Sequence, residues 1–196
     1  MESFQLLASP WYVNLGYLIP LGSYVLWRWH PISVPARKLL YAGIFGAAFG
    51  INEAIVVLYL RASTGLLPGF EEKLIGAADS LSIYEQIQLL NAMPATIVST
   101  EMLREVATLV ILLSLSFAIV RHVWERWALF LWMFAFWDIF YYVGLWFATR
   151  WPHSLLTWDI LFLIPEPWVA QVWFPLLVSA LTAGAVLLSN RHTRTV

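Results

Sequence analysis

The chain contains no cysteine and little charge. Aspartate, glutamate, lysine and arginine make up 12% of its 196 residues, whereas soluble domains typically carry about 25%. The absence of cysteine excludes disulfides, thiol nucleophiles, iron–sulfur clusters and cysteine-bound zinc. Hydrophobic residues make up 61% of the sequence. We therefore expect lipid, rather than water, to solvate much of the protein surface.

Lysine and histidine are also scarce, which restricts the cofactors and partners. Lys38 and Lys73 both lie outside the long apolar segments, so neither is placed to hold retinal in mid-membrane. The histidines lie near segment ends, which argues against a bis-histidine haem: they are His30, His122, His153 and His192. The motifs E-x-x-H, H-E-x-x-H and G-x-S-x-G are missing. A net charge of −1 does not suggest a nucleic-acid partner.

Five apolar segments are long enough to cross a membrane, which takes about 20 helical residues. They are residues 11–27, 39–60, 101–120, 127–149 and 169–189. The third can span only if it includes the charged residues at its start, Glu101, Arg104 and Glu105. The sequence thus predicts an all-α, polytopic membrane bundle of five transmembrane helices, with residues 1–196 forming a single integral membrane domain.

Two further apolar segments are too short to span. Residues 80–93 place Ile83, Ile87 and Leu90 on one helical face, which predicts a short outer interfacial helix covering the pocket described below. Residues 154–168 have an apolar core around Asp159 that ends at Pro165. This pattern is interpreted as a short re-entrant or interfacial element.

The basic residues predict an orientation. Lysine and arginine favour cytoplasmic loops, and seven of them flank the spans on one side against three on the other. This bias places the N-terminus outside and the C-terminus in the cytoplasm. No basic stretch precedes the first apolar segment, so we do not expect a cleaved signal peptide.

Charged residues inside the predicted spans gather toward the outer leaflet. Glu101, Arg104 and Glu105 have the i, i+3, i+4 spacing of one helical stripe. Glu53 shares a helical face with a G-x-x-x-G pair, Gly46 and Gly50, which is typical of close helix packing. Glu53 should therefore face protein rather than lipid.

The fourth predicted span carries one carboxylate, Asp138, near its middle, with Tyr141 and Tyr142 on the same face. Four intramembrane carboxylates then face a single arginine. An acid without a counter-charge in such a place takes up a proton, binds a cation or lies in a water-filled cavity. We expect an outward-facing pocket that binds a cation, a proton or a polar head group. Its candidate residues are Glu53, Glu101, Arg104, Glu105, Asp138, Tyr142 and Asp159.

Two other functions fit the same residues. In a metal-assisted enzyme acting on a lipid or a quinone-like substrate, a hard divalent cation would bind the carboxylates. The candidate ligands are Glu53, Glu101, Glu105 and Asp138, with His153 as a nitrogen ligand. In an accessory subunit of a larger complex, or in a homo-oligomer, the acids would instead join helices. Membrane lipid is the expected partner in each case.

Four stretches carry a resemblance to a known group of proteins. They are "EAIVVLYLR" at 53–61, "EMLREVATLVILL" at 101–113, "WDIFYY" at 137–142 and "SLLTWDILFLIPEPW" at 154–168. Together they resemble a group of bacterial multi-spanning inner-membrane proteins of uncharacterised activity. The resemblance implies a bacterial inner-membrane location, in which the outer side is the periplasm, and no cofactor or reaction.

Overall fold

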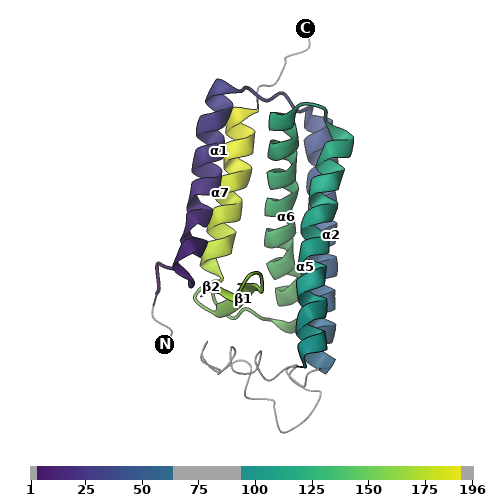
Figure 1. Cartoon of the computed structure of the whole chain (residues 1–196), viewed down its shortest axis with the longest axis vertical. Coiled ribbons are helices and arrows are strands. Elements are labelled where there is room, and N and C mark those ends of the chain that lie inside the picture. The colour runs from purple at the N-terminus through teal and green to yellow at the C-terminus, as the bar shows by residue number, and fades with distance from the viewer. Residues whose placement is uncertain (1–3, 64–93, 191–196) are drawn as a thin grey trace.

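The computed structural model describes residues 4–63 and 94–190, and in this part the chain is mostly helical (Figure 1). The helices are η1 (Trp11–Tyr17, a 3₁₀ helix), α1 (Leu18–Trp29), α2 (Ala36–Ser63), α5 (Ala95–Ile119), α6 (Val123–Thr149) and α7 (Trp173–Ser189). The strands are β1 (Trp158–Phe162) and β2 (Trp168–Gln171). The predicted interfacial helix at 80–93 lies outside the described residues.

Three helices, α2, α5 and α6, are long and apolar enough to cross a membrane. Their surfaces agree with this, because many large apolar side chains are exposed, including Leu103 at 69% and Phe147 at 79%. Isolated soluble domains rarely expose so much contiguous apolar surface. The prediction of a mostly helical chain with apolar helices that could span a membrane is confirmed.

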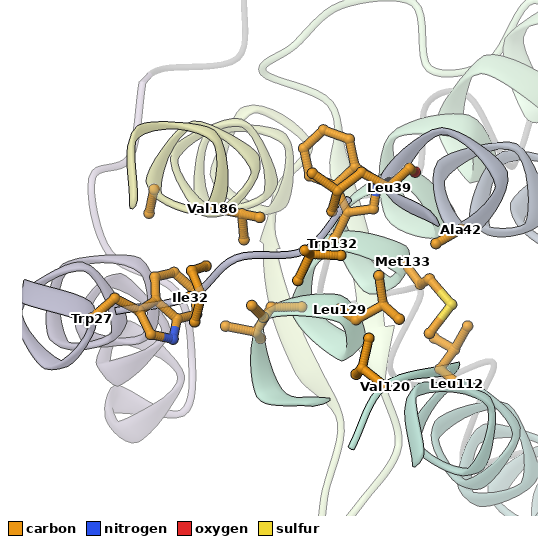
Figure 2. Close-up of a cluster of buried hydrophobic side chains, with 14 of the residues drawn as sticks. Trp27, Ile32, Leu39, Ala42, Leu112, Val120, Leu129, Trp132, Met133 and Val186 are labelled. Atoms are coloured by element: carbon orange, nitrogen blue, oxygen red, sulfur yellow. Dashed lines mark hydrogen bonds between the residues drawn. The ribbon is translucent and has the colours of Figure 1, made fainter. Parts of the chain in front are cut away.

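The helices lie side by side, with α6 in the middle (Figure 1). Helices α2 and α5 pack against α6 on one side, and α7 packs against it on the other, with α1 outside α7. Figure 2 shows side chains from all five of these helices converging on Leu129, Trp132 and Met133 of α6, and Leu129 and Met133 are fully buried. Helix α6 is therefore the core of the bundle.

Two glycines let α2 approach α6 closely. A Cβ atom at Gly46 would lie 2.5 Å from the carbonyl oxygen of Met133, and one at Gly50 would overlap the carbonyl oxygen of Trp137. Only hydrogen fits at these two positions. The G-x-x-x-G spacing predicted this close approach, and one turn further along α2 the Glu53 side chain is buried.

The first predicted span consists of two kinds of helix. The 3₁₀ helix η1 ends at Tyr17, and α1 begins with Leu18, two residues before Pro20. Proline has no backbone N–H, and in the first turn of an α-helix that N–H has no intrahelical acceptor anyway. Pro20 therefore fits in the first turn of α1, just after the change of helix type.

Residues 154–168 are not helical. They contribute β1 to an antiparallel hairpin with β2, in the register Trp158↔Gln171 and Asp159↔Ala170. The strictly all-α prediction is wrong here, and the fifth helix begins at Trp173 rather than at residue 169. Pro165 and Pro167 interrupt the segment and prevent a continuous helix. The N-terminal segment lies along the hairpin edge, where Ser9 and Val169 exchange two backbone hydrogen bonds of 2.8 and 2.7 Å.

Substitution of Gly50 by alanine tests the α2–α6 contact. The added methyl group would overlap backbone atoms of α6, so we expect Gly50→Ala to lower the free energy of unfolding by about 1–3 kcal/mol, the usual cost of overpacking. Gly184→Ala is the matched control, since nothing lies within 4 Å of a Cβ atom there. Thermal unfolding in detergent measures both variants. Equal stability of the two would contradict the close packing.

Candidate functional site

The buried carboxylates Glu53, Glu105 and Asp159 lie toward the end of the bundle that carries the hairpin. The polar residues at this end form two neighbouring groups around α6. The arginine cluster consists of Glu53, Glu101 and Arg104 and joins α2 to α5. The aspartate cluster consists of Asp138, Tyr142, Asp159 and Ser179 and joins α6 to β1 and α7.

Arg104 is the centre of the arginine cluster. Its guanidinium forms an ion pair with Glu53 across the α2–α5 contact. It also binds Glu101 on its own helix, where Nε and Nη2 lie 2.8 and 2.7 Å from Oε2. The side chains of Glu53, Glu101 and Arg104 are 8%, 12% and 22% exposed. One cation thus pairs with two carboxylates and balances the charge of one of them.

Glu105 fastens the hairpin to α5. Both of its carboxylate oxygens lie 3.0 Å from the backbone nitrogen of Leu163, which donates to them just after β1 ends. Glu105 is buried, and its charge also interacts with that of Arg104. A carboxylate that accepts a backbone N–H in this way satisfies a donor that the turn of the hairpin would otherwise leave unpaired.

The aspartate cluster lies on the other side of α6. The Ser179 hydroxyl of α7 donates to Asp138 over 2.8 Å, and the Tyr142 hydroxyl donates to Asp159 over 2.9 Å. Asp138 and Tyr142 are one helical turn apart, and Asp159 reaches them from β1. Tyr142 and Asp159 are buried, at 5% exposure each. The two carboxylates lie close enough to interact electrostatically.

The two clusters are adjacent. Tyr141 and Tyr142 are consecutive on α6, with ring centroids 5.0 Å apart. Tyr141 interacts electrostatically with Arg104, whereas Tyr142 interacts with Asp138 and Asp159. The tyrosine pair therefore connects the arginine cluster to the aspartate cluster around one face of α6.

Every residue named as a site candidate from the sequence lies at this end of the bundle, but the carboxylates do not share one centre. Glu53 and Glu101 surround Arg104, Glu105 holds the hairpin, and Asp138 and Asp159 form the second cluster. Among residues 4–63 and 94–190, no three histidine, aspartate or glutamate side chains are arranged to hold a metal ion. His153 is exposed on the loop before β1. The described residues therefore give the divalent-cation site no support.

Sequence reasoning missed two members of the polar network. Ser179 lies in the fifth predicted span, which has no charged residue. Its hydroxyl group within an apolar run was the only sequence signal that it belongs to the polar network. The backbone N–H of Leu163 carries no sequence signal at all. Tyr141 was recognised as sharing a face with Asp138, but its position beside Arg104 depends on how α5 packs against α6.

Comparison with known protein families, with characterised proteins and with solved structures found no match for this chain. The likeness to bacterial inner-membrane proteins therefore stays an expectation from the sequence. Conclusions about function depend on the geometry of the two clusters.

Arg104 can be tested by a double-mutant cycle with Glu53. Arg104→Gln leaves a buried carboxylate without its counter-charge, so we expect the free energy of unfolding to fall by about 3–5 kcal/mol. The double variant Glu53→Gln/Arg104→Gln removes both charges and should recover part of that loss. Chemical unfolding in detergent gives the values, and Arg28→Gln, at an exposed arginine, is the control. Additive effects of the two substitutions would show that the ion pair does not stabilise the fold.

Proposed function

We propose that the chain is an integral membrane protein that binds a proton or a small cation at the aspartate cluster. Asp138 and Asp159 supply the negative charge, and Tyr142 and Ser179 hold their carboxylates in place. This proposal narrows the pocket expected from the sequence to one side of α6. The arginine cluster beside it has a structural role.

The proximity of the two aspartates carries the proposal. Asp138 and Asp159 interact electrostatically, and Asp159 and Tyr142 are buried. Two carboxylates in a low-dielectric setting do not both stay ionised unless a positive charge compensates them. Arg104 already pairs with Glu53 and Glu101. A proton shared by the two aspartates, or a cation bound to their oxygens, would reduce the repulsion between their negative charges.

The hydrogen-bond donors around Asp138 and Asp159 are compatible with a shared proton and with a bound cation. The hydroxyl groups of Ser179 and Tyr142 donate to one oxygen of Asp138 and of Asp159, respectively. These bonds hold one oxygen of each carboxylate in place, so that the pair is oriented to share a proton or to bind a cation. A cation would find an oxygen-rich environment, which hard ions prefer. A proton is easier to bind at this site than a cation, because a proton does not need three or more ligands.

The remaining two helices complete the proposed five spans. Helices η1 and α1 together extend about 32 Å, from a rise of about 2.0 Å per 3₁₀ residue and 1.5 Å per α-helical residue. Helix α7 has 17 residues and extends about 26 Å. Both lengths are close to the hydrocarbon thickness of about 30 Å.

The charges favour one orientation in a bacterial inner membrane. Arg28, Arg37, Lys38, Arg121 and Arg126 lie at or near the end opposite the hairpin. The hairpin end holds Asp159, Glu166 and the buried acids. Because basic residues favour the cytoplasmic side, we propose that the hairpin and the aspartate cluster face the periplasm, with the C-terminus in the cytoplasm.

A second candidate function is an accessory subunit of a larger membrane complex. It is favoured by the hydrogen bonds and ion pairs that each candidate carboxylate makes within the chain, because acids partnered in this way also serve to join helices. Helix α5 also keeps an exposed apolar face, with only 17% of its most apolar stretch buried. The alternative of a metal-assisted enzyme has no such observation in its favour.

Infrared difference spectroscopy tests the aspartate cluster. We expect a protonated-carboxyl C=O band in the purified protein at neutral pH, because the charge of the pair must be reduced. Asp138→Asn and Asp159→Asn each keep shape and hydrogen bonding, and each should abolish this band. Glu125→Gln, at the opposite end, is the matched control and should leave it unchanged.

Equilibrium dialysis with Na⁺, Ca²⁺ and Mg²⁺ tests whether the aspartate cluster binds a cation instead of a proton. If the band is missing, one of these ions should bind, and both asparagine variants should lose it. A protein that shows neither the band nor a bound ion contradicts the proposal. If the asparagine variants then lose only stability, the accessory-subunit function is favoured.

Single cysteines test the orientation, since the chain has none of its own. Ser154 and Ser33 are both exposed, the first beside the hairpin and the second between α1 and α2. We expect a membrane-impermeant maleimide to label Ser154→Cys in intact cells, and to label Ser33→Cys only after the membrane is opened. The reverse pattern would contradict the proposed orientation.

A further inference from the structure

A cavity opens at the end of the bundle opposite the aspartate cluster. It has a volume of about 580 Å³ and lies where the start of α2, the end of α5 and the start of α6 meet. Its polar lining includes Lys38, Arg121, His122 and Glu125, and Phe117 forms part of its apolar wall. None of these residues belongs to the site described above.

Two basic side chains bind the last carbonyl groups of α5, and one of them, Lys38, lines the cavity. The carbonyl groups in the last turn of a helix have no intrahelical partner and attract cations. Lys38 donates to the carbonyl of Ile119 over 2.8 Å, and Arg126 donates to that of Val120 over 3.0 Å. A lysine ammonium has three N–H donors, so this bond fixes Lys38 and leaves two donors for a ligand.

Two helix starts add positive potential to the same place. Helix α2 begins at Ala36, directly after Pro35, and α6 begins at Val123, directly after His122. Within the part of the chain that the structure describes, no side chain caps the first turn of α6. The N–H groups of a first helical turn lack intrahelical acceptors and favour anions. They reinforce the lysine and arginine here.

The formal charges of the lining match a singly charged anion. Lys38 and Arg121 contribute two positive charges and Glu125 one negative charge, with His122 taken as neutral. One positive charge remains. A phosphodiester carries a single negative charge, so it would balance this lining without leaving an excess of either sign.

The surroundings of the cavity suit a lipid. Phe117 is 51% exposed, and Leu113 lies one turn below it on α5 at 43%. An apolar surface that continues from a basic cavity along membrane helices is what a phospholipid requires, with its head group in the cavity and its acyl chains on the helices.

We infer that this cavity binds the phosphate group of an anionic phospholipid, with Lys38 and Arg121 as its ligands. Glu125 opposes the anion and limits its affinity. The same phosphate chemistry has a second source in free inorganic phosphate, which would lack the contacts along Phe117 and Leu113. This inference is independent of the aspartate cluster, which lies at the other end of the bundle.

Native mass spectrometry of the full chain, delipidated in detergent, tests the site with phosphatidylglycerol, phosphatidylcholine and inorganic phosphate. We expect phosphatidylglycerol to bind most tightly. Arg121→Gln should weaken it about fivefold, the effect of one basic residue near an anionic lipid, while Arg121→Lys keeps most of the affinity. Glu125→Gln should strengthen binding. Arg28→Gln removes an exposed charge from α1, outside the cavity, and should change nothing.

The possible results distinguish a lipid site from a phosphate site and from the absence of a site. Equal binding of phosphatidylcholine and phosphatidylglycerol, or equal weakening by Arg28→Gln and Arg121→Gln, overturns the site. Displacement of the lipid by inorganic phosphate at matched concentration overturns the lipid source and leaves a phosphate site. If Arg121→Gln does not fold, the opposite effect expected from Glu125→Gln still decides, since an unchanged affinity in that variant overturns the site.

Discussion

The close approach of α2 to α6 is the contact on which the hairpin end of the molecule depends. Gly46 and Gly50 admit the backbone of α6, and this brings the next turn of α2 within reach of neighbouring helices. There Glu53 meets Arg104 of α5, and Ala54 packs close to Gly144 of α6. A wider spacing would separate Glu53 from its only described counter-charge. The aspartate cluster on the far side of α6 inherits its position from the same packing.

The acids and Arg104 at the hairpin end of the bundle are placed where partners exist, because an unpaired charged group costs several kcal/mol away from water. Arg104 satisfies two acids, and Glu105 satisfies a backbone N–H of the hairpin. Asp138 and Asp159 accept hydrogen bonds from the hydroxyl groups of Ser179 and Tyr142 and lie close enough to each other to interact electrostatically. This proximity of two carboxylates distinguishes the proposed binding site from the structural network.

The two ends of the bundle carry charged residues of opposite sign. Acids dominate the hairpin end and are largely buried, whereas arginine and lysine dominate the other end and are largely exposed. A buried acid has lost its water and requires a proton or a cation, while an exposed base keeps its water and recruits anions at short range. The same physical difference makes the first end a candidate site for positive species and the second a candidate site for lipid phosphate.

The sequence by itself determined the helical membrane character and the α2–α6 contact, because long apolar runs and G-x-x-x-G spacing are local patterns. It also placed Glu53, Arg104 and Asp138 toward the same end of the bundle, since depth follows from position along a span. Only the tertiary structure decided which acid meets which partner. Arg104 lies 51 positions from Glu53, and Ser179 lies 41 from Asp138, so no local pattern connects them. The hairpin was likewise invisible, because a ten-residue apolar stretch fits a strand or a short membrane element equally well, and pairing with β2 and Ser9 decides between them.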